Sequence, residues 1–125
     1  MGDHGVGWAA SNLDELGDGP GFRKIRTTLD VTAFGINALV LPAGFSAPFH
    51  AHERQEETYF VHSGVIEMEF GLEGGQRVRL EAGGVVRVDA DTFRRIHNVG
   101  ETDAVLVIAG GEGGYVGRDG VPPPA

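Results

Sequence analysis

The sequence contains no cysteine, and this absence excludes several kinds of chemistry. Disulfide bonds, thiolate metal sites and thiol nucleophiles all need cysteine, so this chain can use none of them. Long apolar runs are also missing, since no segment approaches the roughly 18 residues that a membrane-spanning helix needs. The first residues lack the basic residues and the apolar run of a signal peptide. These absences predict a cytoplasmic protein.

Basic residues are scarce. The chain has 10 lysines and arginines against 18 aspartates and glutamates, a formal net charge of −8, and no run of basic residues. Binding to a nucleic-acid backbone or to anionic lipids relies on clustered positive charge. We therefore expect neither a nucleic acid nor a membrane as partner, and we expect a small molecule as ligand.

Turn-forming residues are abundant, with 21 glycines and six prolines among 125 residues. Between them lie short stretches rich in valine, isoleucine and phenylalanine, which favour strands over helices. Such stretches occupy residues 22–30, 34–41, 65–70, 85–89, 93–99 and 104–110. Strands that recur about every ten residues are typical of an all-β sandwich or jelly-roll barrel.

The length allows one domain, which we place at residues 22–116. Residues 1–21 are rich in glycine and acidic residues and predict a loosely ordered arm. Its Trp8 either anchors the arm on the barrel or contacts another subunit. Residues 117–125 have few apolar residues and predict a flexible tail.

One hairpin can be predicted with its register. Residues 65–70 alternate apolar and acidic side chains, and a five-residue loop leads to a strand that starts near Arg77. Pairing across this loop matches apolar with apolar and acid with base. The expected pairs are Ile66 with Leu80, Glu67 with Arg79, Met68 with Val78 and Glu69 with Arg77.

A candidate metal site lies in the segment GFSAPFHAHERQEETYFVHSG, residues 44–64. His50 and His52 are two residues apart, so on a strand they point to the same side. Glu57 follows a polar turn and adds a carboxylate from a neighbouring strand. Two imidazoles and one carboxylate suit Fe, Mn, Ni, Zn or Cu and leave coordination positions open for a substrate.

This segment resembles the first motif of the cupin family, G-x5-H-x-H-x4-E-x6-G. All fixed positions match, at Gly44, His50, His52, Glu57 and Gly64. The resemblance implies a double-stranded β-helix, a form of jelly-roll barrel, with a mononuclear site for a divalent transition metal. It also implies a homodimer, because small cupins commonly pair.

The second cupin motif, G-x5-P-x-G-x2-H-x3-N, is damaged. Gly83 and Asn98 match its ends, but Asp89 replaces the proline and Arg94 replaces the histidine that normally completes the metal site. An arginine stays charged and cannot ligate a metal. Arg94 then either pairs with Glu57 and leaves a metal-free site, or stands beside the metal and binds the carboxylate or phosphate of a substrate.

Other side chains could supply a further ligand. His97 lies three residues after Arg94, so a regular strand points it to the opposite face. Glu53 and Glu56 are solvated turn residues unless the turn bends inward. His62 faces away from Glu57 by the same alternation and is expected to be a packing or surface residue.

Two classes of function remain open. The first is a metal-dependent enzyme, of oxygenase or isomerase type, that acts on a small anionic molecule. The second is a metal-free barrel that binds or senses such a ligand without catalysis. The cupin fold alone does not choose between them, because it carries many activities. Substrate, reaction and metal identity are not fixed by the sequence.

Overall fold

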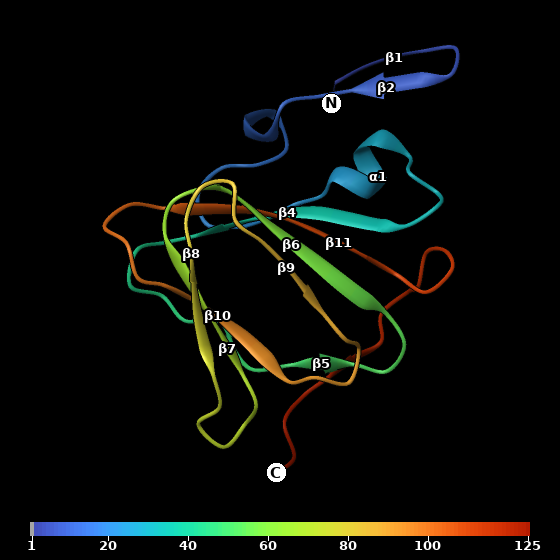
Figure 1. The fold of residues 1–125 in the computed structure, drawn as a ribbon. Helices are drawn as coiled ribbons and strands as arrows, with labels where there is room; N and C mark the ends of the chain where they lie inside the picture. The colour runs from blue at the N-terminus through green and yellow to red at the C-terminus, as the bar shows by residue number, and fades with distance from the viewer. Residues whose placement is uncertain (1) are drawn as a thin grey trace.

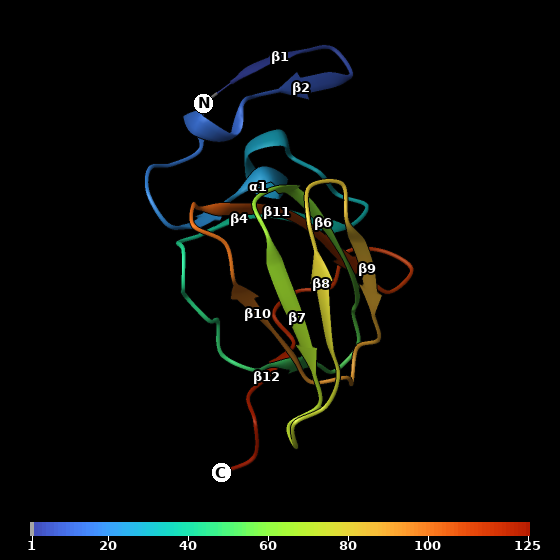
Figure 2. The same cartoon turned by 60° about the vertical axis from the view of Figure 1, so that its left-hand side comes forward.

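The computed structural model describes residues 2–125, which form a β-barrel made of two facing sheets (Figure 1). The larger sheet is antiparallel, in the order β3 (Gly21–Arg23), β4 (Gly35–Leu41), β11 (Ala104–Gly111), β6 (Glu56–Ser63) and β9 (Val85–Val88). The smaller sheet is β10 (Arg94–Asn98), β7 (Ile66–Phe70) and β8 (Arg77–Leu80), and Figure 2 shows these three strands side by side. The all-β barrel predicted from the spacing of the strands is confirmed.

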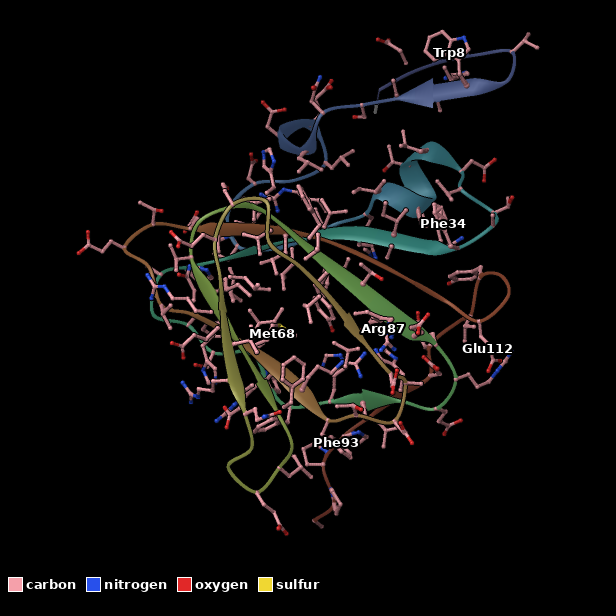
Figure 3. The ribbon with its side chains drawn as sticks, in the orientation of Figure 1. Trp8, Phe34, Met68, Arg87, Phe93 and Glu112 are labelled. Carbon is pink, nitrogen blue, oxygen red and sulfur yellow. The ribbon has the colours of Figure 1, made fainter. Side chains whose placement is uncertain are left out.

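The core lies between the two sheets. Every second residue of the strands points inward, and most of these residues are apolar. The larger sheet contributes Leu41, Tyr59, Val61 and Leu106, and the smaller sheet contributes Ile66, Met68 and Ile96. Figure 3 shows Met68 pointing into the barrel. Apolar burial between the sheets therefore fixes the positions of the polar side chains that share the interior.

The β7–β8 hairpin has the predicted register. Met68 pairs with Val78, Ile66 with Leu80, Glu67 with Arg79 and Glu69 with Arg77. Arg77 lies 3.1 Å from Glu67 Oε1 and 3.3 Å from Glu69 Oε1 on the outer face. The alternation of apolar and charged residues is thus enough to set this hairpin, as a slip by one residue would place the charges in the core.

The predicted strand at residues 22–30 is wrong beyond Arg23. β3 is only three residues long, and α1 (Ile25–Leu29) follows it. The helix ends at Asp30, which adopts a left-handed conformation with φ of 59°, and Val31 N–H bonds to the carbonyl of Arg26. The helix also stacks Arg26 on the Tyr115 ring at 3.9 Å. Such long-range contacts override a weak local preference for strand.

The two ends of the chain differ in structure. The arm forms a hairpin, β1 (Asp3–Gly5) with β2 (Trp8–Ala10), and a short 3₁₀ turn, η1 (Leu13–Glu15), and it stands apart from the barrel in Figures 1 and 2. Trp8 is 58% exposed and does not anchor the arm on the barrel (Figure 3). Neither helix in residues 2–125 is long and apolar enough to span a membrane.

The tail contains a strand that the sequence analysis did not expect. β12 (Gly120–Val121) pairs antiparallel with β5 (Ala51–His52). This strand is held by backbone pairing and by hydrogen bonds of Asp119, which directly precedes it. Neither needs apolar residues, so the composition of the tail could not predict the strand. Pairing at Gly120 and Val121 places the tail directly beside the candidate metal ligands.

A matched pair of valines in β9 tests the position of the core. Val88 is 3% exposed and Val85 is 62% exposed in the same strand. Replacing Val88 by alanine removes two buried methyl groups and should lower the free energy of unfolding by about 1.5–3 kcal/mol. Val85→Ala should lower it by no more than about 0.5 kcal/mol. Urea denaturation of both variants measures the difference, and equal losses would contradict the assigned inner face.

Candidate metal centre

His50 and His52 are positioned by pairing with two different segments. His50 forms an isolated bridge with Arg94, with reciprocal backbone hydrogen bonds of 3.0 Å. His52 lies in β5 and pairs with Gly120 of β12. Their rings sit on the same side, with centroids 5.0 Å apart, while Ala51 between them is buried on the other side. The spacing of the two histidines thus places both imidazoles together, as predicted.

Glu57 reaches the same place from β6 in the opposite sheet, between Val88 of β9 and Gly110 of β11. A side chain at Gly110 would block it, because a Cβ there would lie 3.2 Å from Glu57 Cγ and 2.5 Å from Gln55 Oε1. The glycine therefore leaves room for the carboxylate. The sequence analysis missed this requirement.

Four side chains of the site approach the same oxygen of Glu57. Its Oε1 atom lies 2.7 Å from Tyr59 Oη, 2.7 Å from Arg94 Nη2, 3.2 Å from His52 Nε2 and 3.8 Å from His50 Nε2. Burial alone would raise the pKa of the Glu57 carboxyl, but these four groups hold the pKa well below its usual range. The carboxylate is therefore ionised throughout the physiological range.

The three predicted ligands have donor atoms that fit one ion. A ligand atom of each lies within 4.8 Å of the others, and no other such group occurs within residues 2–125. Two donors that are each about 2.1 Å from a metal lie about 3 to 3.5 Å apart. The distances from Glu57 Oε1 to the two imidazole nitrogens are close to this spacing.

The contact of His52 Nδ1 with Asp119 determines whether His52 Nε2 carries a proton. His52 Nδ1 lies 2.8 Å from Asp119 Oδ1, and an ionised carboxylate only accepts, so Nδ1 carries the proton. In a neutral ring this leaves a lone pair on Nε2, which is buried and has no hydrogen-bond partner within the described chain. That lone pair faces the Glu57 carboxylate at 3.2 Å. Two electron pairs at this distance call for a cation between them, either a metal ion or a proton.

Asp119 is itself held firmly. It accepts hydrogen bonds from the backbone N–H of Arg54 at 2.8 Å and of Gln55 at 3.0 Å, and from the Gln55 side chain at 2.6 Å. Burial acts to raise the pKa of Asp119, but these hydrogen bonds outweigh it and lower the pKa. Sequence reasoning missed Asp119, a single acid in a glycine-rich tail with no motif around it.

Arg94 takes the first of its two predicted positions, paired with Glu57. Besides the Glu57 contact, its Nε donates to Tyr59 Oη at 3.2 Å, and its Nη1 donates to the carbonyls of Asp89, Ala90 and Thr92. The side chain is 0% exposed and does not line the cavity beside the histidines. The substrate-binding role predicted for Arg94 therefore lacks the exposure that it would need.

Tyr59 connects Arg94 to Glu57. Burial raises the pKa of Tyr59, and the negative charge of Glu57 raises it further, so the hydroxyl stays protonated. It donates to Glu57 and accepts from Arg94. The three side chains form one hydrogen-bonded unit, and its Glu57 carboxylate faces the two histidines.

The other candidate ligands lie elsewhere. His97 is on the outer face, where Nε2 lies 2.7 Å from Glu69 Oε1 and Nδ1 lies 2.6 Å from Ser46 Oγ. Glu56 pairs with Arg87 at 3.2 Å on the surface. Glu53 and His62 are exposed. None of the four belongs to the cluster of His50, His52 and Glu57.

Residues 38–110 match the family of the cupin domain. The chain belongs to the cupin family. Its match includes the two histidines, Glu57 and Arg94, whereas Asp119 lies outside it. A search of curated proteins found no match.

Solved cupin structures agree in fold. A cupin protein from Bacteroides fragilis is 21% identical, with 90% of each chain covered and a TM-score of 0.70. A Klebsiella pneumoniae protein with a double-stranded β-helix domain is 18% identical, with 83% of this chain and 90% of that chain covered and a TM-score of 0.70. These two confirm the predicted double-stranded β-helix.

A third similar structure, described as a predicted oxalate decarboxylase from Thermotoga maritima, is 28% identical with a TM-score of 0.56. The match covers 61% of this chain and 64% of that one. This chain thus spans less than two thirds of the length of the Thermotoga protein.

The role of Asp119 can be tested through His52. Burial acts to lower the pKa of His52, but the hydrogen bonds and charges of Glu57 and Asp119 outweigh it and raise the pKa above its ordinary value. Asp119→Asn removes one negative charge, so the pKa of His52 should fall in metal-free protein. An NMR titration of the imidazole carbon protons measures this shift.

Glu112→Gln is the matched control, because Glu112 pairs with exposed Arg54 at 3.0 Å near the same tail. It should leave the titration of His52 unchanged. An unchanged pKa of His52 in Asp119→Asn would rule out the proposed contact.

Proposed function

We propose that this cupin holds one divalent transition metal with His50, His52 and Glu57, and that it binds and acts on a small anionic molecule there. The observation that supports this most is the buried Nε2 of His52. Asp119 fixes the proton of the neutral ring on the other nitrogen, so in that form a lone pair is aimed at the Glu57 carboxylate 3.2 Å away. A metal ion would satisfy both groups at once.

Two histidines and one carboxylate form a ligand set that suits Fe, Mn, Ni, Zn or Cu and leaves positions open to a ligand. When bound, such a metal would supply a Lewis acid able to polarise an oxygen of the substrate, as oxygenase- or isomerase-type chemistry requires. The chain's own residues would orient the ligands. Asp119 holds the His52 ring, and Tyr59 and Arg94 hold the carboxylate of Glu57.

Arg94 makes this site differ from one with a third histidine. It leaves three protein ligands instead of four and places a cation 2.7 Å from Glu57 Oε1. The carboxylate then shares its charge between the guanidinium and the metal, so we expect a weaker metal affinity and a more electrophilic metal.

A metal-free ligand-binding or sensor barrel is the second candidate function. The Arg94–Glu57 pair favours it, because the carboxylate already has a cationic partner. The raised pKa of His52 favours it as well, since a proton on Nε2 could take the place of the metal. The two candidates differ in whether the purified protein contains stoichiometric metal.

The name of the Thermotoga protein, predicted oxalate decarboxylase, supports an anionic ligand. Oxalate is a small dicarboxylate. We also expect a homodimer in the cytoplasm, and light scattering at micromolar concentration that found only a 13.2 kDa species would exclude the dimer.

Replacing either histidine tests the metal site. His50→Ala and His52→Ala each leave two protein ligands and should lower metal affinity by at least about 100-fold. Metal content after dialysis, measured by plasma mass spectrometry, reports the loss. His62→Ala is the control, because His62 is exposed in the same strand as Glu57 and should keep full metal content. The assignment is falsified if both site variants also keep it.

Arg94→Met separates the two candidate functions. Methionine fills much of the same buried space without the charge, so metal affinity should stay equal or rise as a competing cation is removed. The free energy of unfolding of metal-free protein should fall by about 3 kcal/mol, because Glu57 loses its buried cationic partner.

Arg87→Met, at an exposed arginine, should change neither quantity by much. If wild-type protein binds no metal and Arg94→Met does, the metal-free barrel is the better description. Calorimetric titration with Mn²⁺, Ni²⁺ and Zn²⁺ measures the affinities.

A further inference from the structure

The cavity above the candidate metal centre is larger than a metal and a two-carbon acid need. Its volume is about 880 Å³. Cavities of about 300 to 1,000 Å³ hold molecules of drug size. The space therefore has room for a ligand with a substantial body as well as its metal-binding group.

The walls of the cavity are mainly apolar. Its floor is formed by core side chains of both sheets, among them Leu39, Leu41, Ile96 and Ile108. Three aromatic residues also line it although they are well exposed, with Phe22 at 58%, Phe45 at 49% and Tyr115 at 45%. They are three of the six exposed aromatic side chains within residues 2–125. Such a gathering around one cavity provides a surface for an apolar ligand.

Positive charge lines the same cavity in an otherwise acidic chain. Lys24, Arg26 and Arg118 all line it, and none of them forms an ion pair within residues 2–125. The acidic residues that line it are Glu57 and Asp119, which already contact Arg94 and His52 respectively. The net charge of the chain is −8, yet three of the five lysines and arginines that form no ion pair within residues 2–125 line this one cavity.

The cations lie at both ends of the cavity. Arg118 directly precedes Asp119, which holds His52, so Arg118 is at the metal end. Lys24 and Arg26 lie at α1, and Figures 1 and 2 place α1 and β5 at opposite ends of the barrel. Arg26 is held in place by stacking on Tyr115 at 3.9 Å. An anionic group at either end would meet a guanidinium, while the middle of the ligand would face apolar side chains.

We propose that the ligand is an organic acid with a hydrophobic body, aromatic or branched aliphatic, whose anionic group is bound by Arg118 or by Arg26. The inference rests on the proposed function, because it takes the cavity beside His50 and His52 to be the ligand site. It replaces Arg94 as the predicted anion-binding residue with two arginines that line the cavity. It also excludes oxalate as the preferred ligand, since oxalate would leave the apolar walls and most of the volume unused.

Three probes of different chemistry test the proposal. Calorimetry with 2-naphthoate, its neutral analogue 2-naphthamide and oxalate compares charge and apolar body separately. We expect 2-naphthoate to bind at least about ten times more tightly than either of the others. If oxalate or the amide binds as tightly as 2-naphthoate, the proposal is overturned.

Variants locate the binding. The single carboxylate of 2-naphthoate can meet only one end of the cavity, so one of the variants Arg118→Gln and Arg26→Gln should weaken binding by about five-fold or more, and Phe45→Ala should weaken it by a similar factor. Arg87→Gln is the control, because Arg87 does not line the cavity and should leave binding unchanged. These side chains are at least partly exposed, so the variants are expected to fold, and thermal unfolding checks this. Unchanged affinity in both arginine variants would overturn the proposal.

Each titration is run on protein with and without bound metal. Wild-type protein that binds 2-naphthoate selectively but no metal would contradict the proposed metal site and leave the ligand class standing. Wild-type protein that binds metal at His50 and His52 but prefers oxalate would contradict the ligand class and leave the metal site standing. The two ideas therefore fail by different results.

Discussion

The interior of this barrel depends on one ionised carboxylate, that of Glu57. A buried charge is costly unless it is paired and hydrogen-bonded, and here one oxygen is approached by a guanidinium, a phenol and two imidazoles. These groups come from β6, from β10 and from the histidine segment, so the carboxylate connects both sheets. The apolar core packs against one side of this polar unit, and the cavity lies on the other side. Partial burial strengthens each of its contacts.

The replacement of a family histidine by Arg94 changes what the site can do. The Arg94 guanidinium donates hydrogen bonds to Glu57 and to three backbone carbonyls at once, so its role is structural. A cation that is fully buried cannot also receive a ligand. In our proposal, recognition of an anion is therefore assigned to arginines that line the cavity, because Arg94 is buried and does not line it.

Much of the fold and of the ligand cluster could be predicted because both follow local periodicity. Alternation fixes the β7–β8 register and brings His50 and His52 to one side, and the motif spacing brings Glu57 to them. The remaining features are set by contacts between distant residues. Asp119 meets His52 across 67 positions, and α1, which forms where a strand was expected, places Arg26 on the distant Tyr115 ring. No spacing rule reports such contacts, and none decides which way Arg94 turns.

The contact between Asp119 and His52 means that the site can be completed only late in the synthesis of the chain. The two residues are separated by 67 positions, which at about 5 to 20 residues per second is an interval of several seconds. During that time the histidine ring has no carboxylate to fix its tautomer, and β5 has no β12 to pair with. An emerging chain therefore presents its motif long before it presents a finished site. For the metal site that we propose, His52 would therefore have its tautomer fixed by Asp119 only after β12 has paired with β5.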